Sequence, residues 1–286
     1  MTSTAGSTTP PARPVRRAAV VTHGRPELIG EAVERVREVA TAAGVEIVPE
    51  DSETARQLLQ PGRGATADIA IVLGGDGTML RALTRFLGLG VPVIGVNFGR
   101  VGFLSSMAQE ELETGLARVL AGDYVVVELP TLEVETGGTR HVAVNDAVVT
   151  SGALGRMVEL EWAVGGEDLG RQPCDGVICS TPSGSTAYNL SNGGPVLVWG
   201  IDAMAITFVA PHSLHARPLV VPRGRDLVVS NRTADVPVAV LVDGHHVAEA
   251  APQHGQVTIR LGDAHSLLAT LPEATFVRRY RQSFAS

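Results

Sequence analysis

An uninterrupted apolar run that ends in a glycine-rich turn is the feature that most constrains how this chain can fold. Residues 69–73 read Ile-Ala-Ile-Val-Leu, and Gly-Gly-Asp-Gly-Thr follows at 74–78. Apolar residues in succession, without alternation, are typical of a strand that is buried on both faces of a parallel sheet. The glycines allow a tight turn that a ligand can approach without meeting a Cβ atom.

The turn at 74–78 also has the chemistry of a phosphate site. The amides that follow Asp76 are expected to open a helix, whose apolar pattern begins at Met79. Unpaired N–H groups and the macrodipole at a helix start attract phosphate. Asp76 is the only side chain in this turn able to act as a base. The turn therefore indicates a phosphoryl-transfer site, with a phosphate cradle formed by Gly74, Gly75, Gly77 and Thr78.

Composition restricts the class of protein and of ligand. A length of 286 residues allows two domains, and 44% hydrophobic with 19% charged residues is ordinary for a globular protein with a sizeable core. The net charge of -7 weighs against nonspecific nucleic-acid binding, which needs a basic face. No stretch approaches the ~20 apolar residues of a membrane span, and the start lacks the apolar segment of a signal peptide. We therefore expect a cytoplasmic protein that binds neither nucleic acid nor membranes.

The two cysteines do not indicate a metal site. Cys174 and Cys179 have no nearby pair of Cys or His residues that would complete a zinc site. They flank an apolar run, so we expect reduced residues in the core or near the site.

Strands and helices alternate over the first part of the chain. Residues 1–14 have no periodicity and are expected to form a disordered tail. Further strands are expected over 18–21, 45–48 and 91–96, and helices over 28–43 and 108–121. A second glycine-rich turn at 97–104 falls beyond the carboxyl end of a strand, where ligands bind in parallel sheets. The alternation predicts an α/β domain with a parallel sheet over 15–122.

The pattern changes near residue 123. Closely spaced strand-like runs with glycine-rich turns replace the helices and indicate a β-rich, sandwich-like domain over 123–271. The strands are expected over 131–135, 140–144, 157–164, 227–230, 236–242 and 257–261. The basic segment 277–281 lies in a final piece, about 272–286, that could pack back on the first domain.

Polar stretches in the β-rich region are candidates for a binding site. Asn145-Asp146 follows an apolar strand, where polar side chains would face a cleft, although this is also a common turn pair. Residues 175–188 run from a strand into hydroxyl residues, Pro and Gly, and end at Tyr188. Small donors at this density suit ribose, phosphate and base edges, and the tyrosine could stack on a planar ring. No Gly-X-Ser-X-Gly sequence occurs in this stretch, which disfavours a serine hydrolase.

Together these motifs resemble the NAD kinase family and occur in that family's order over about 18–281. The Gly-Gly-Asp-Gly-Thr turn alone is less specific, because diacylglycerol-type lipid kinases share it and phosphofructokinases have a related one. The hydroxyl-rich run and the Gly-Gly-Pro after it are more specific. The matching stretches are 74–78, 102–104, 145–146, 175–176, 180–188, 193–195, 211–214 and Asp243-Gly244, which alone would be an ordinary hairpin turn.

The resemblance implies transfer of the ATP γ-phosphate to the adenosine ribose 2′-hydroxyl of NAD, which gives NADP; some relatives use polyphosphate. It implies an α/β domain followed by a β-rich domain, a divalent metal (magnesium) with unknown ligands, and a homodimer or homotetramer. Asp76 would be the general base. The residues implied to bind NAD are Asp76, Gly77, Arg81, Phe103, Asn145, Asp146, Arg156, Asp175, Thr186, Ala187, Tyr188, Asn189, Leu190, Ser191 and His245.

Several positions keep an alternative open. Arg81 either reaches an anion at the site or lies on a solvated helix face. Asp146 stands where the family commonly has Glu, and His245 where Gln or Arg is frequent. Pro173 replaces a basic residue for which Arg171 could substitute. The departures at Pro173 and His245 concern substrate affinity and the choice between NAD and NADH more than the reaction. A lipid kinase and a non-catalytic nucleotide sensor are the rival functions.

Overall fold

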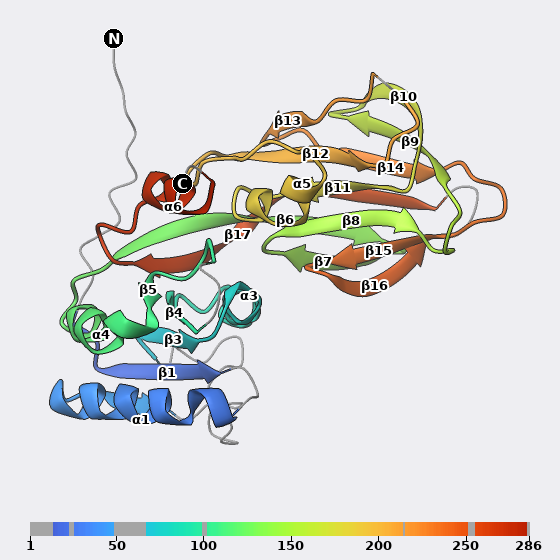
Figure 1. The fold of residues 1–286 in the computed structure, drawn as a ribbon. Helices are drawn as coiled ribbons and strands as arrows, with labels where there is room; N and C mark the ends of the chain where they lie inside the picture. The colour runs from blue at the N-terminus through green and yellow to red at the C-terminus, as the bar shows by residue number, and fades with distance from the viewer. Residues whose placement is uncertain are drawn as a thin grey trace, which may run out of the picture. The chain divides into compact units, whose positions relative to one another are not determined.

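The computed structural model describes residues 14–22, 26–48, 67–98, 102–213, 215–250 and 255–284 (Figure 1). The chain divides into two units: unit 1 comprises residues 1–128 and 266–286, and unit 2 comprises residues 129–265. Both divisions fall inside long strands, β6 (Val125–Thr136) and β17 (Gln256–Thr270). The predicted boundaries after residues 122 and 271 stay a proposal, and residues 1–13 of the predicted tail lie outside the described residues.

Unit 1 is an α/β unit built on a parallel sheet. Its strands follow the order β2-β1-β3-β4, all neighbours are parallel, and the end of β17 joins β4 through Leu268 and Val93. Helices α1 and α4 contribute to the core cluster that covers the sheet. The bounds are β1 Arg17–Thr22, α1 Pro26–Ala42, β2 Glu46–Val48, β3 Ile69–Leu73, α3 Asp76–Arg85, β4 Val93–Asn97, β5 Met107–Ala108, η1 Gln109–Glu111, α4 Leu112–Leu120 and α6 Phe276–Phe284.

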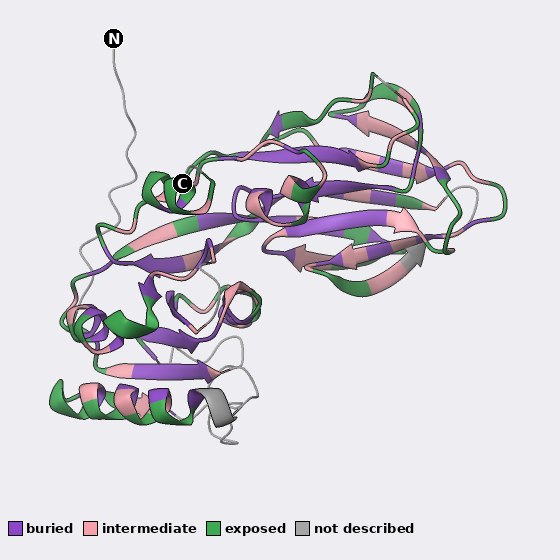
Figure 2. Ribbon diagram, in the orientation of Figure 1, coloured by how far each residue is buried: buried purple, intermediate pink, exposed green. Residues whose placement is uncertain are grey.

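Strands β3 and β4 lie in the interior of the parallel sheet, and their sequences reflect that position. Every residue of both strands is buried, as the purple colour of β3 in Figure 2 illustrates. Full burial on both faces explains why their sequences do not alternate between apolar and polar residues. The glycine-rich turns at 74–75 and 102–104 follow the carboxyl ends of these two strands.

Helix α3 begins at Asp76, so the amides after Asp76 open a helix as expected, and the apolar pattern starts three residues later at Met79. Gly75 is its N-cap, with φ −93° and ψ −172°, and the Gly75 carbonyl accepts the N–H groups of Thr78 at 2.9 Å and Met79 at 3.1 Å. Apolar periodicity missed the first turn because Asp76, Gly77 and Thr78 carry no apolar signal. As a result, Asp76 belongs to the helix and not to the turn before it.

Unit 2 is an antiparallel β sandwich. One sheet has the order β13-β12-β11-β8-β15-β16, and the other contains β10-β9-β14-β17 with β6 and β7. Their facing side chains form one core, to which Leu160 and Val229 come from one sheet and Val149 and Ile206 from the other. The bounds are β7 Thr139–Ala143, β8 Asp146–Ser151, β9 Val158–Val164, β10 Glu167–Cys174, β11 Gly176–Ser180, η2 Gly184–Thr186, α5 Tyr188–Ser191, β12 Ala203–Val209, β13 Leu219–Pro222, β14 Leu227–Asn231, β15 Val238–Val242 and β16 His245–Ala250.

The predicted fold class, an α/β unit with a parallel sheet followed by a β-rich unit, is confirmed. Cys174 and Cys179 are free and buried in the core of unit 2, as expected. Burial raises the pKa of the Cys174 thiol to about 12, so this thiol is protonated at neutral pH. Among the described helices, none has the length and apolar character needed to cross a membrane.

Candidate functional site

In unit 1, the carboxylate of Asp76 is held by the second glycine-rich turn. Its Oδ2 accepts the backbone N–H of Phe103 at 2.6 Å, and its Oδ1 accepts that of Leu104 at 3.1 Å. Gly102 lies so close that a Cβ atom there would collide with the carboxylate. One donor on each oxygen fixes both the position and the rotation of the carboxylate group.

The predicted phosphate cradle lies at the start of α3. A Cβ on Gly74 would come within 2.6 Å of the Thr78 hydroxyl, so this glycine is required by packing. Among the residues that the structure describes, nothing lies within 4 Å of a Cβ placed on Gly75 or Gly77, and Gly77 is exposed. A ligand can therefore approach the backbone at Gly75 and Gly77, beside the carboxylate of Asp76.

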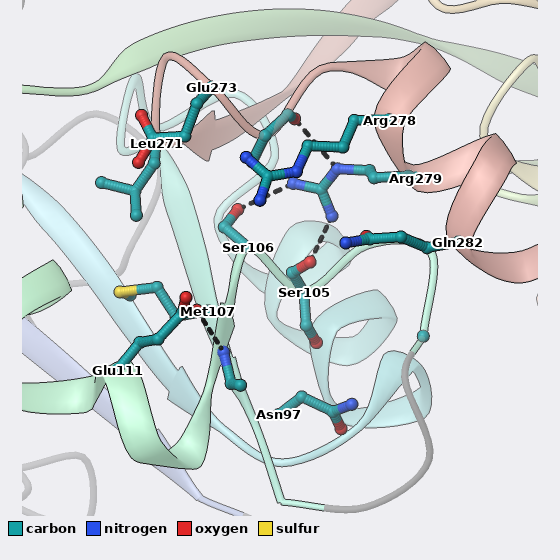
Figure 3. Close-up of a pocket in the computed structure, with 13 residues that line it drawn as sticks. Asn97, Ser105, Ser106, Met107, Glu111, Leu271, Glu273, Arg278, Arg279 and Gln282 are labelled. Carbon is teal, nitrogen blue, oxygen red and sulfur yellow. Dashed lines mark hydrogen bonds between the residues drawn. The ribbon is translucent and has the colours of Figure 1, made fainter.

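Helix α6 fixes the turn at 102–106, whose amides bond to Asp76. The Arg279 guanidinium, 5% exposed, donates from Nη1 to the carbonyls of Phe103, at 2.9 Å, and Ser105, and from Nη2 to the Ser106 hydroxyl at 2.9 Å (Figure 3). Its Nε donates to the Ala274 carbonyl at 3.1 Å. Burial lowers the pKa of Arg279 to about 10, which leaves the group charged at neutral pH.

The Phe103 ring packs on the same helix. It lies edge-on to Phe276, with ring centroids 5.1 Å apart, and stacks with Phe284 at 6.0 Å. The residue is only 6% exposed. Phe103 therefore contributes its backbone to Asp76 and its ring to the α6 contact.

A cavity of ≈ 360 Å³ lies beside this turn (Figure 3). Asn97 at the end of β4, Gly102 and Ser105 of the turn, and Arg278 and Gln282 of α6 line part of its wall. The Ser105 hydroxyl is buried and has no hydrogen-bond partner within the described part of the chain. The cavity thus offers polar groups next to the Asp76 turn.

In unit 2, the carboxylate of Asp243 organises the predicted Asn145-Asp146 pair. It accepts three successive backbone N–H groups, from Val144 at 2.9 Å, Asn145 at 2.7 Å and Asp146 at 3.2 Å. Asp243 itself has φ 49° and Gly244 has φ 78°, the left-handed conformation that a tight hairpin requires. The Asp-Gly pair, which taken alone would be an ordinary hairpin turn, therefore also anchors the loop before β8.

Burial changes the properties of the polar side chains of Asn145 and Asp146. Asp146 is 7% exposed, and burial together with the Asp243 charge raises its pKa to about 7. Burial also raises the pKa of Asp243, although its three amide donors oppose that shift. The Asn145 Oδ1 atom is buried without a hydrogen-bond partner in the ranges that the structure describes. An acceptor and a carboxyl that titrates near neutrality therefore stand side by side at the start of β8.

Much of the hydroxyl-rich run faces inward. The Thr181 and Ser183 hydroxyls both donate to the Val144 carbonyl, at 2.7 Å and 3.0 Å. The Ser185 hydroxyl donates to the Pro182 carbonyl at 2.7 Å and accepts the Leu197 N–H at 2.9 Å. These hydroxyls stabilise the protein's own loops. The sequence alone could not distinguish such internal hydrogen bonds from donors that face a ligand.

Helix α5, which follows this run, contains a buried and an exposed candidate residue, Asn189 and Tyr188. Asn189 is fully buried; its Nδ2 donates to the Ser185 carbonyl at 3.1 Å and the Pro195 carbonyl at 3.0 Å, and its Oδ1 accepts the Thr207 hydroxyl at 2.7 Å. Tyr188 beside it is 46% exposed. Asn189 thus holds the loop together, whereas Tyr188 is accessible to a ligand.

The remaining predicted contacts are spread over both units. Asp76, Gly77, Arg81 and Phe103 belong to unit 1, and all the others belong to unit 2. Arg156 forms an ion pair with Asp235 at 3.0 Å, and the His245 Nδ1 lies 3.0 Å from the Asp243 carbonyl. Exposed side chains belong to Arg81, Arg156, Asp175, Ser191 and His245, and half-buried ones to Thr186, Ala187 and Leu190. Arg171, a possible substitute at position 173, pairs instead with Glu159 and Glu161, each at 3.3 Å.

Sequence reasoning did not assign a role in the site to Asp243 or Arg279. The signal for Arg279 was weak: it lies in a basic segment, three residues after Phe276, a spacing that places both on one helix face. For Asp243, the Asp-Gly pair indicated a turn and was one of the stretches that resemble the family, but nothing local shows what its carboxylate accepts.

Comparison with known proteins agrees with this arrangement. Residues 20–124 match the model of the ATP-NAD kinase N-terminal domain, and residues 144–271 match that of the C-terminal domain. An NAD kinase from Symbiobacterium thermophilum is 41% identical over 227 residues, which cover 76% of this chain and 78% of that protein. One from Gemmatimonas aurantiaca is 39% identical over 222 residues, 75% and 76% of the two chains.

Two solved structures share the fold. A yeast NADH kinase complexed with NADH has a TM-score of 0.79 at 21% identity, and the match covers 96% of this chain and 88% of that one. An NAD kinase from Archaeoglobus fulgidus in complex with ATP has a TM-score of 0.72 at 26% identity and covers 94% and 97%. The chain therefore belongs to the NAD kinase family and is an enzyme of that type.

Proposed function

We propose that this enzyme transfers the γ-phosphoryl group of ATP to the 2′-hydroxyl of the adenosine ribose of NAD, with Asp76 as the general base. The observation that carries the proposal is the fixed carboxylate of Asp76 in the first turn of α3, next to glycines that leave the backbone open. The ATP complex of the archaeal relative and the NADH complex of the yeast protein support nucleotides of these two kinds as ligands.

In the proposed step, the ribose 2′-oxygen attacks the γ-phosphorus, the bond from that phosphorus to the bridging oxygen breaks, and ADP leaves. Asp76 accepts the hydroxyl proton through a lone pair that the Phe103 and Leu104 amides do not use. General-base help contributes roughly 10²–10⁴-fold. The remainder is positioning and stabilisation of a loose, metaphosphate-like group, to which amides at the start of α3 are suited.

Three residues of unit 2 offer groups that could contact NAD in this proposal. Asn145 offers a buried acceptor without a partner in the described ranges, Asp146 a carboxyl, and Tyr188 an exposed ring. Ribose hydroxyls and the carboxamide can donate to the first two, and a planar base can stack on the third.

The residues that the structure describes do not fit a metal held by the protein alone. Within the described ranges no group of three or more His, Cys, Asp or Glu residues could ligate a metal ion. Mg²⁺ in phosphoryl-transfer enzymes is held largely by substrate phosphates with one or two carboxylates. Magnesium would therefore be held mainly by the phosphates of ATP, where it would neutralise their charge.

The test is NADP formation by the purified chain with NAD and either ATP or polyphosphate, followed by the same assay on Asp76→Asn. We expect turnover with ATP, a 2′-phosphate by NMR of the product, and loss of roughly 10²–10⁴-fold in kcat for the variant with NAD binding retained by calorimetry. Near-normal turnover of Asp76→Asn would remove Asp76 from the role of base. A homodimer or homotetramer stays a prediction of the family resemblance, which sedimentation equilibrium would test.

A further inference from the structure

Phe103 is the link between two sets of hydrogen bonds in unit 1. Its backbone N–H donates to Asp76 at 2.6 Å, and its carbonyl accepts from the Arg279 guanidinium at 2.9 Å. Both ends of one residue's backbone are therefore fixed, one by the carboxylate and the other by the cation. A change at Arg279 acts on Asp76 through a single intervening residue.

Arg279 also fixes the residues that follow in the turn. It donates to the Ser105 carbonyl and to the Ser106 hydroxyl, so the guanidinium spans the turn from 103 to 106. Figure 3 shows the guanidinium pointing at Ser105 and Ser106 from α6, at the wall of the cavity. The planar fork of donors is what allows one side chain to hold several acceptors at once.

The site tolerates little displacement. Gly102 lies against the Asp76 carboxylate without room for a Cβ atom, so a shift of the turn moves Asp76 or loses its two amide donors. Misplacement of a reacting group by about 1 Å can cost about 10²-fold in rate. The geometry of the turn is thus as important to Asp76 as its own side chain.

We propose that Arg279 is a positioning residue for catalysis: it clamps the turn 102–106, whose amides hold Asp76. The inference rests on the proposed role of Asp76 as base. Burial of a charged group is costly, and four hydrogen bonds to the turn and to Ala274 offset that cost. The same helix adds the aromatic contacts of Phe276 and Phe284 to Phe103.

The experiment compares Arg279→Ala, Arg279→Lys and Arg281→Ala in the full chain. Arg281 is exposed on the same helix and serves as the matched control. We expect Arg279→Ala to lower kcat by about 10²-fold while the KM for NAD changes less than about threefold. Millimolar guanidinium should restore part of kcat by occupying the vacated space. The kcat of Arg279→Lys should lie between those of Arg279→Ala and Arg281→Ala, because lysine keeps the charge but lacks the planar set of guanidinium donors.

A double-mutant comparison separates positioning from general loss of structure. In an Asp76→Asn background, Arg279→Ala should change the residual turnover by less than about threefold, because the clamp no longer has a base to hold. A role in folding alone would lower turnover by the same factor in both backgrounds and would overturn the proposal. Melting curves and NAD calorimetry confirm that the variants are folded.

The outcomes distinguish this inference from the proposed function. Loss of turnover in Asp76→Asn together with normal kcat in both Arg279 variants would refute the inference and leave the base assignment intact. Normal turnover in Asp76→Asn would refute the base assignment itself. If Arg279→Ala does not fold, a kcat of Arg279→Lys equal to that of Arg281→Ala contradicts the clamp, and a selective loss of kcat supports it.

Discussion

The backbone N–H of Asn145 donates a 2.7 Å hydrogen bond to the carboxylate of Asp243, 98 residues further along the chain. The same carboxylate accepts the N–H groups on either side of Asn145. A hairpin residue in the left-handed conformation therefore determines where the Asn145-Asp146 pair lies. The two ends of this contact are far apart in sequence but belong to the same unit.

Asp243→Asn tests this anchor. Asn tolerates the left-handed conformation, so the hairpin is kept while the charged acceptor is lost. We expect unit 2 to lose about 2 kcal/mol of unfolding free energy and the KM for NAD to rise. Urea unfolding and steady-state kinetics measure both effects. Asp263→Asn, at a fully exposed carboxylate, is the control and should change neither; equal behaviour of the two variants would contradict the anchor.

The pKa of Asp146 predicts a dependence of stability on pH. Burial and Asp243 raise the pKa from 3.8 to about 7, so between these values the folded chain binds a proton that the unfolded chain releases. The unfolding free energy from this group is therefore highest below about pH 4 and falls as pH rises towards 7, by about 4 kcal/mol. In Asp146→Asn this component should vanish, which urea unfolding from pH 4 to 8 would show. Parallel pH profiles for the two proteins would refute it.

Gly102→Ala should disable the site without removing a functional side chain. The new Cβ atom collides with the Asp76 carboxylate and must displace it, so kcat should fall by about 10²-fold while the calorimetric affinity for NAD is retained. Gly30→Ala, in helix α1 with no described residue within 4 Å of the new Cβ, is the matched control. It should stabilise the protein by about 0.5–1 kcal/mol and leave kcat unchanged. Unaltered kcat in Gly102→Ala would show that the turn can yield without moving Asp76.

Tyr188 and Asn189 should respond in opposite ways to truncation. Tyr188→Ala is expected to raise the KM for NAD with a change in stability below about 0.5 kcal/mol, because the ring is 46% exposed. Asn189→Ala leaves two carbonyls and the Thr207 hydroxyl without their partner, and should cost about 2–3 kcal/mol. Thermal melts and NAD titrations distinguish the two. An unchanged KM in Tyr188→Ala would remove it from the NAD site.

The parallel sheet could be predicted from the sequence because its signals are local. The unbroken apolar runs of β3 and β4 and the glycines that end them lie within a few residues of one another. The apolar pattern taken alone would start α3 three residues late, at Met79, because Asp76 and Gly77 carry no apolar signal although they are helical. Local patterns predict where elements occur better than where they begin.

The supports of the site could not be predicted because they act over long separations. Arg279 reaches Phe103 across 176 residues, and no local pattern shows that contact. The hydroxyls of Thr181 and Ser183 illustrate the opposite error: a run of donors was interpreted as a binding surface, yet both bond to the Val144 carbonyl. The sequence alone does not show which polar groups form hydrogen bonds within the protein and are therefore unavailable to a ligand.

The distance from Phe103 to Arg279 also has a consequence for synthesis. At about 5–20 residues per second, a ribosome needs roughly 9–35 s to add the 176 residues between them. All of unit 2 is made in that interval, so unit 1 cannot follow the usual order in which the earlier unit is completed first. A nascent chain therefore carries Asp76 and the turn at 102–106 for most of its translation without the helix that anchors that turn.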